Sequence, residues 1–184
     1  MNDRYHHGDL RSALLREALV MVEEVGPSGV SLRELARRTK VSHGAPAHHF
    51  RDRRALLTAL ASQSLHLLAS EVRNATPRGF DEAAVAYVRF ARENPGRYAV
   101  MYRDDLLDSA DPEFESARAE SMAALLEGVT SIPEERRPEL SLDEAAHVAW
   151  SLVHGLASLP ARAFGSRDEP DDEVVRRAAR QLFG

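Results

Sequence analysis

The sequence predicts an all-α protein of about nine helices, in which a three-helix N-terminal head with a helix-turn-helix precedes a helical body. Apolar residues recur at three- and four-residue steps along most of the chain, which is the period of an amphipathic helix. Two helix N-cap signals stand only eleven positions apart, at Ser31 and Ser42. No segment shows the two-residue alternation that is typical of a β-strand.

The stretch from Ser31 to Phe50 (SLRELARRTKVSHGAPAHHF) predicts a helix, a tight turn and a second short helix. Ser31 and Glu34 have capping-box spacing, so the first helix is expected to begin there, with its arginines pointing to water. Two helices capped so close together must turn sharply, as in the helix-turn-helix that enters a DNA major groove. A polar helical hairpin in any small bundle has the same pattern, so the residues alone leave both interpretations open.

The second helix of this stretch would present small and imidazole side chains to DNA. Small residues let the backbone approach a groove wall, and His side chains and helix N-terminal amides can bind phosphate oxygens. Phe50 is expected to anchor this helix in the core. The candidate DNA-binding residues of the two helices are Ser31, Arg33, Ser42, His43, Gly44, Ala45, His48 and His49.

The segments on either side of this stretch are predicted to form helices that support it. A helix capped by Asp9 is predicted to end near Val25, before Gly26-Pro27. The residues before it are expected to form a disordered arm, in which Arg4 could add phosphate or minor-groove contacts. A long helix over 52–73 is predicted to connect the head to the body.

Composition excludes several classes of protein. With 184 residues the chain can bury a substantial core, and with no Cys it has neither disulfides nor thiolate metal ligands. No apolar run approaches the ~20 residues of a membrane span, and no signal-peptide core is present at the N-terminus. A soluble, cytoplasmic protein without a membrane partner is therefore expected.

Charge is distributed unevenly along the chain. Residues 1–60 hold 10 Arg and Lys against 7 Asp and Glu, a net charge of +3, and the remaining residues hold 14 against 22, a net charge of -8. Five of the eight His residues also lie in residues 1–60. Because only the docking face must be positive, a basic head on an acidic body suits a protein that binds a phosphate backbone.

Helical patterns continue through the body. The helix expected over 141–164 is apolar on nearly all sides, so it must be covered on all sides. The last helix, over 170–183, has a narrow apolar stripe that could dock on its own chain or on a second copy. The remaining helices are predicted over 81–93, 96–107 and 112–128.

The helix-turn-helix stretch resembles the DNA-binding domain of the TetR family of bacterial transcriptional regulators, whose pattern is L-x-x-[IV]-A-x-x-x-G-V-S-x-G-x-[LP]-Y-x-H-F followed by a charged pair and L-L. The resemblance covers about the first third of the chain. In three places the chain departs from the pattern: Lys40 replaces a turn Gly, Ala47 replaces an aromatic residue, and Arg54 replaces a frequent acidic residue. The matching residues are Leu32, Leu35, Ala36, Val41, Ser42, Gly44, Ala45, Pro46, His49, Phe50, Arg53, Arg54, Leu56 and Leu57.

This resemblance implies a DNA-binding domain over 1–52 and an effector-binding and dimerisation domain over 53–184. It adds Arg53, at the first turn of the long helix, to the phosphate-binding candidates. It also implies a homodimer that pairs through its last two helices and binds a palindromic double-stranded DNA operator. In this family such a regulator is most often a repressor, released by a small-molecule effector. No cofactor is implied.

A second resemblance concerns W-x-x-x-H-G, formed by Trp150, His154 and Gly155, which is typical of one C-terminal subtype of TetR regulators. Trp150 and His154 share a helix face and could line an effector pocket. The alternative is a core Trp packed on a hydrogen-bonded His. The remaining candidates would favour a small, largely apolar effector; they are Tyr87, Phe90, Tyr98, Met101, Tyr102 and His147.

Enzymatic function is the main rival class. The chain has no Gly-rich phosphate loop, no G-x-S-x-G and no H-E-x-x-H, and His147 and His154 lie too far apart to share one Zn²⁺ without another element. We therefore predict a protein that is not an enzyme and has no metal site. An all-helical enzyme, or a ligand-binding bundle without a DNA-binding role, is the alternative.

Overall fold

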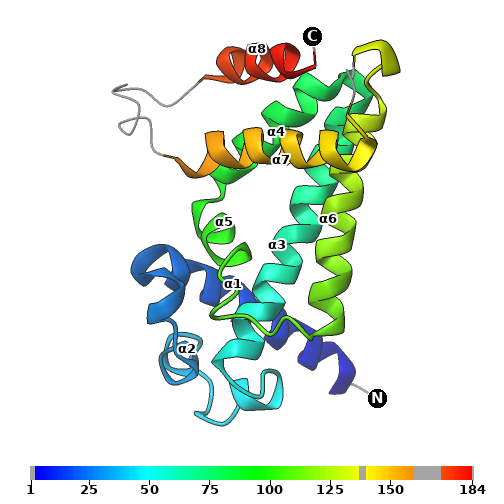
Figure 1. Cartoon of the computed structure of the whole chain (residues 1–184). Helices are drawn as coiled ribbons and strands as arrows, with labels where there is room; N and C mark the ends of the chain where they lie inside the picture. The colour runs from blue at the N-terminus through cyan, green and yellow to red at the C-terminus, as the bar shows by residue number, and fades with distance from the viewer. Residues whose placement is uncertain (1–2, 137–139, 160–170, 184) are drawn as a thin grey trace. The chain divides into compact units, whose positions relative to one another are not determined.

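The computed structural model describes residues 3–136, 140–159 and 171–183, and within these it contains eight α-helices and three short 3-10 helices (Figure 1). The predicted all-α class is confirmed. Across the described residues, none of the helices is long and apolar enough to cross a bilayer. The α-helices are α1 (Asp3–Gly29), α2 (Leu32–Arg38), α3 (Arg53–Ala75), α4 (Phe80–Glu93), α5 (Pro95–Met101), α6 (Pro112–Thr130), α7 (Leu142–Ser158) and α8 (Asp172–Leu182). The 3-10 helices are η1 (Pro46–His48), η2 (Thr76–Arg78) and η3 (Glu134–Arg136).

The chain forms two compact units. The first contains Met1–Ser64 and Asn94–Arg118, and the second contains Leu65–Glu93 and Ala119–Gly184. Helices α3 and α6 contribute residues to both units. The first unit therefore combines the predicted head with α5 and the segment that follows it. The boundary expected after residue 52 separates DNA binding from effector binding and dimerisation, which the division into compact units does not test. It stays a prediction.

Helix α1 supports the first unit through a buried stripe. Contrary to the expectation of a disordered arm and a cap at Asp9, α1 already begins at Asp3. Residues 3–8 contain no proline, and extending a helix costs little because each added residue forms a further hydrogen bond. The regular helix breaks as predicted at Gly26, which has a φ of 72°. The buried stripe consists of Leu14, Leu15, Ala18, Met21 and Val22.

Helix α5 packs against α1 in the same unit. Its buried Gly96 permits this close approach, because a Cβ there would lie 2.6 Å from Cγ of Glu23. The helix ends at Met101, which corrects the prediction that it continues to residue 107. Beyond that point, a side chain of α3 satisfies a backbone group that a longer helix would have satisfied itself. Arg54 donates to the carbonyl oxygen of Leu107 at 3.1 Å.

In the second unit, α4 contacts both α7 and α8 (Figure 1). Phe80 of α4 meets Phe183 edge to face, with 5.2 Å between ring centroids. Two ion pairs flank this contact, from Arg176 to Glu82 at 2.5 Å and from Arg180 to Asp81 at 2.7 Å. The apolar stripe of α8 therefore docks in part on its own chain, and two of its members, Val175 and Ala179, are buried there.

Helix α7 begins at the predicted place and ends early. Ser141 and Glu144 form a complete capping box at its start. The helix stops at Ser158 instead of continuing to 164, and residues 160–164 lie outside the described part of the chain. Its buried side is made largely of alanines. Within one chain α7 is therefore not covered on all sides: Leu142 and Val148 are exposed.

Candidate nucleic-acid interface and candidate effector site

The predicted cap of α2 is present in part. The Ser31 side chain caps the helix, but the Glu34 carboxylate binds arginines instead of the backbone N–H of Ser31. Ser31 Oγ accepts a hydrogen bond from the backbone N–H of Glu34 at 3.2 Å. The Glu34 carboxylate accepts hydrogen bonds from Arg37 at 2.8 Å and from Arg38 at 3.0 Å. Arg38 also pairs with Glu24 at 2.6 Å. Arg38 therefore ties α2 to α1, which corrects the expectation that it points to water.

The two arginines give the head a pH dependence. Their hydrogen bonds lower the pKa of Glu34 from 4.5 to about 2. Because a depressed carboxyl pKa stabilises the fold above the unfolded value, this contribution is lost as pH falls from about 4.5 to about 2. We expect Glu34→Gln to flatten the free energy of unfolding over that window, measured by urea titration at stepwise pH. Glu71→Gln, at an exposed glutamate of α3 with no ion pair among the described residues, should leave the curve unchanged; an equal effect of both variants would contradict the assignment.

The turn after α2 has a strained backbone. Lys40 has a φ of 56°, the only positive φ at a non-glycine residue in the described part of the chain. Glycine, which the family pattern has at this position, adopts such a conformation without a Cβ clash. The left-handed conformation costs an L-residue about 1–2 kcal/mol because Cβ crowds the following carbonyl oxygen.

Replacing Lys40 with glycine should therefore stabilise the protein. We expect a gain of about 0.5–1 kcal/mol in the free energy of unfolding, because the greater freedom of glycine in the unfolded chain offsets part of the relieved strain. The measurement is urea unfolding followed by circular dichroism. Lys40→Ala removes the same charge but keeps Cβ, so it should give no such gain. Equal stabilisation by both variants would place the effect in the lysine side chain instead.

The predicted second helix is a run of tighter turns. Backbone N–H groups bond three residues back, from Ala45 to Ser42 at 2.9 Å and from His48 to Ala45 at 3.3 Å, and the helix η1 covers only Pro46–His48. An α-helix begun at Ser42 would need the N–H of Pro46, which proline lacks. The predicted second short helix is therefore present as the 3-10 helix η1, which begins four residues after Ser42.

The predicted DNA-binding residues lie at the surface around this turn. Phe50, 3% exposed, anchors it as predicted, and the Arg11 guanidinium lies 5.4 Å from its ring centroid. Three candidates are only partly exposed, namely Ala45, His49 and Arg53. The exposed ones are Ser31, Arg33, Ser42, His43, Gly44 and His48.

Three cations near the turn are available for an anionic ligand. Arg33, Lys40 and Arg53 make no ion pair or hydrogen bond through their side chains in the described ranges 3–136, 140–159 and 171–183. Guanidinium and ammonium groups at such positions can bind phosphate oxygens. Lys40 was not among the sequence candidates, although an exposed basic residue at the turn was a usable signal.

Gly44 is not required by the fold. Its φ is not positive, and a Cβ built there meets no atom within 4 Å. Neither backbone conformation nor internal packing therefore explains the absence of a side chain at this exposed position. An approach by a ligand to the backbone would explain it.

Three of the predicted effector residues meet in the second unit. Tyr87 Oη lies 3.1 Å from His154 Nδ1, and the Trp150 and His154 rings are 5.0 Å apart at 33°. Burial lowers the pKa of His154 below 6.5, so its ring is neutral near pH 7. Phe90 is buried, whereas His147 is exposed on α7.

The other three predicted effector residues belong to the first unit. Tyr98 and Tyr102 pack edge to face, with 5.3 Å between ring centroids, and Met101 is buried next to them in α5. These contacts fit a pocket wall and an ordinary core equally well. The effector role of these residues stays a prediction.

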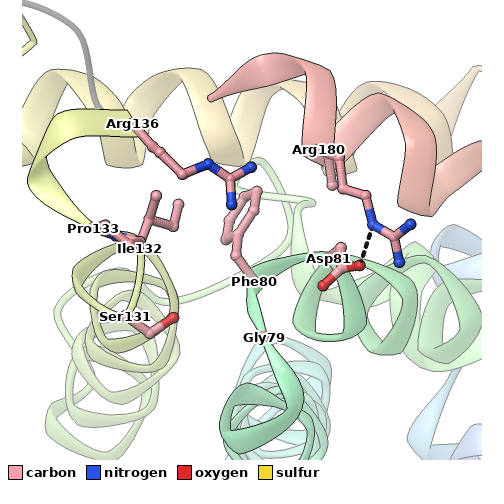
Figure 2. A pocket seen from close by; sticks show the side chains of 9 residues that line it. Gly79, Phe80, Asp81, Ser131, Ile132, Pro133, Arg136 and Arg180 are labelled. Carbon is pink, nitrogen blue, oxygen red and sulfur yellow. Dashed lines mark hydrogen bonds and ion pairs between the residues drawn. The ribbon is translucent and has the colours of Figure 1, made fainter. Parts of the chain in front are cut away.

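A pocket of about 220 Å³ opens at the start of α4 in the second unit (Figure 2). Phe80 and Ile132 give it an apolar wall, and the lining also includes the basic side chains of Arg136 and Arg180. No predicted effector residue lines it. The sequence carries little signal for this pocket, because its walls come from segments some 50 to 100 residues apart. It is smaller than the roughly 300–1,000 Å³ of pockets for drug-sized ligands.

Comparison with known families covers both parts of the chain. Residues 14–60 match the family described as "Bacterial regulatory proteins, tetR family", and residues 80–182 match "Tetracyclin repressor-like, C-terminal domain". The second match alone spans more than half of the chain.

Individual relatives are similar over shorter regions. The class A tetracycline repressor from transposon 1721 of Escherichia coli is 39% identical over 71 residues, which are 39% of this chain and 32% of the repressor. The HTH-type transcriptional regulator BetI of Pseudomonas paraeruginosa is 33% identical over 79 residues, 43% of this chain and 40% of BetI. The matched region thus spans between a third and two fifths of these relatives' length.

Solved structures resemble the whole chain. A protein of unknown function from Rhodococcus sp. RHA1 has a TM-score of 0.81 and 35% identity, covering 98% of this chain and 97% of its own. The TetR family regulator PfmR of Thermus thermophilus has a TM-score of 0.70 at 19% identity, covering 92% and 96%, and it supports the fold alone.

Proposed function

We propose, because this chain belongs to the TetR family of DNA-binding transcriptional regulators, that it acts in the cytoplasm as a homodimeric repressor of a palindromic operator and is released by a small, largely apolar effector. Regulators of this family are not enzymes, and this chain is not one. DNA recognition is assigned to residues 1–52, and effector binding and dimerisation to residues 53–184. The finer assignment to the W-x-x-x-H-G subtype belongs to the same proposal.

One observation carries the DNA-binding part of this proposal. The capped turn after α2 exposes Gly44, and neither the conformation nor the packing of the chain requires glycine there. Arg33 of α2, Lys40 of the turn and Arg53 at the start of α3 make no ion pair in the described part of the chain. A backbone that can approach a groove wall, with cations beside it, suits a DNA duplex better than a neutral ligand.

An uncovered face of α7 supports the homodimer. Val148, Ser151 and Gly155 recur at three- and four-residue steps on this face. Val148 is 38% exposed, and a Cβ at Gly155 would meet no atom within 4 Å. Glycine inside a helix costs about 1 kcal/mol relative to alanine. If the same face of a second copy packed closely here, it would explain the absence of a side chain at Gly155 and would cover the exposed apolar residues.

The character of the effector follows from His154. Burial lowers the pKa of this residue, so the ring carries no charge near pH 7, and Tyr87 occupies its Nδ1. Trp150 adds an aromatic face at 5.0 Å. A neutral, aromatic wall favours an uncharged or weakly polar molecule over an ion.

Footprinting on the intergenic DNA beside its own gene tests the proposal. We expect two protected half-sites related by two-fold symmetry, with centres about 10–10.5 base pairs apart or a multiple of that spacing. Such a pattern requires two recognition turns held by one dimer. A single protected half-site, or protection without symmetry, would contradict the homodimer, and no protection at any concentration would contradict the assigned operator.

A further inference from the structure

The segment Arg103–Asp111, between α5 and α6, is acidic and fastened to the start of α3. It carries four aspartates and one arginine, a net charge of -3. It belongs to the same compact unit as the DNA-binding turn. The backbone N–H of Asp108 donates to Thr58 Oγ1 at 2.9 Å, and Arg54 donates to the carbonyl oxygen of Leu107 at 3.1 Å. The segment is thus held in place by α3 itself.

Asp108 of this segment binds an arginine next to the DNA-binding turn. Its Oδ2 accepts a hydrogen bond from Arg51 Nη2 at 2.6 Å, while its Oδ1 accepts one from the N–H of Ala110 at 3.3 Å. Asp52, 3.4 Å from Arg51 Nε, is a second and weaker partner. The Asp108 side chain is 28% exposed and that of Arg51 is 69% exposed. The carboxylate is therefore fixed, and the guanidinium remains open to solvent.

Arg51 is placed where a duplex at the turn would come within its reach. It follows the exposed His48 by three residues, so at most about 11 Å of backbone separates them. It precedes by two positions Arg53, which makes no side-chain hydrogen bond or close ion pair among the described residues. A carboxylate and a phosphate present similar acceptor geometry to a guanidinium. Asp108 therefore occupies a group that a DNA phosphate could bind.

We propose that Asp108 is an intramolecular competitor of the DNA backbone for Arg51, so that the Arg103–Asp111 segment lowers DNA affinity in the resting protein. While Arg51 is paired with the Asp108 carboxylate, its guanidinium is not available to a DNA phosphate. Any shift that moves the segment away from α3 raises DNA affinity by releasing Arg51. This inference rests on the DNA-binding role alone and is independent of dimer, operator and effector.

Asp108→Asn tests the competition because it keeps the hydrogen-bond acceptor for Ala110 and removes the charge. The probe is a fluorescent DNA duplex of arbitrary sequence, roughly 30 base pairs long, since phosphate contacts do not depend on sequence. An exposed ion pair is weak, so we expect binding about two- to fivefold tighter. The slope of log affinity against log salt should steepen by about one, because one more phosphate is neutralised. An unchanged unfolding temperature shows that the segment stays folded.

Asp104→Asn is the matched control, with the same change of charge in the same segment but no ion pair among the described residues. Arg51→Ala completes a double-mutant cycle: alone it should change affinity little, and combined with Asp108→Asn it should abolish the gain. The proposal is overturned if Asp104→Asn gives the same gain, if Asp108→Asn weakens binding, or if the gain persists without Arg51. If the unmodified protein binds no duplex at all, the DNA-binding role fails as well. Loss of operator symmetry or of effector release alone would overturn only the proposed function.

Discussion

Val148→Asp is expected to prevent the proposed dimer from forming and to weaken operator binding by about 10²- to 10⁴-fold. Val148 lies on the uncovered face of α7, where a second copy would bury it, and a carboxylate buried there without a partner is costly. In a dimer, binding of one subunit raises the effective concentration of the other at the second half-site. A monomer lacks this effect, which is why the expected loss of affinity is large. Sedimentation and fluorescence anisotropy on the footprinted operator measure the two effects.

Val20→Asp is the matched control for this variant. Val20 is 42% exposed, close to the 38% of Val148, but it lies on α1 in the other compact unit. It should leave both dimerisation and operator affinity nearly unchanged. If both variants stay dimeric, the α7 face is not the interface. If Val148→Asp unfolds the chain, Ser151→Arg on the same face offers a second disruption at an exposed position.

Enlarging Gly44 should weaken DNA binding in proportion to side-chain size while leaving the fold intact. A Cβ at this position meets no atom within 4 Å, and φ is not positive, so neither Gly44→Ala nor Gly44→Leu should destabilise the protein. Against a DNA backbone the added atoms must be accommodated at a cost of about 1–3 kcal/mol for leucine. That cost corresponds to about 5- to 150-fold lower affinity.

The control for the glycine series is Ser116→Leu, an exposed small-to-large change on α6 in the same compact unit. It should not alter DNA affinity. Fluorescence anisotropy on the operator, with urea unfolding for stability, separates the two effects. Unchanged affinity for both Gly44 variants would mean that this backbone does not face DNA, and the recognition surface would then have to lie elsewhere on the head.

The sequence could predict the helices because their signals are local. Ser31 accepts the cap hydrogen bond that its spacing to Glu34 indicated, and α7 begins where the helical pattern after Ser141 predicted. The departure at Lys40 is local in the same way, because a tight turn that needs a positive φ is strained wherever a non-glycine residue occupies it. Pro46 also acts locally: it lacks the N–H that an α-helix begun at Ser42 needs, and the chain forms the 3-10 helix η1 instead.

What the sequence could not predict depends on contacts between distant residues. Arg38 pairs with Glu24, fourteen positions away, so an arginine expected to face water became part of the α1–α2 contact. Beyond the early end of α5, the carbonyl oxygen of Leu107 accepts a hydrogen bond from Arg54, 53 positions earlier in the chain. The pocket beside Phe80 joins three segments in the same way. Periodicity and spacing contain no information about such pairs.

The salt dependence of DNA affinity tests the central claim most directly. If cations around the exposed turn bind phosphates, the logarithm of operator affinity should fall linearly with the logarithm of salt concentration, with a slope of several units. Arg53→Ala should lower the affinity and reduce the magnitude of the slope by about one, the value of one phosphate contact, while leaving dimerisation intact. Binding that is insensitive to salt, or a slope unchanged by Arg53→Ala, would contradict a DNA-binding surface at this turn.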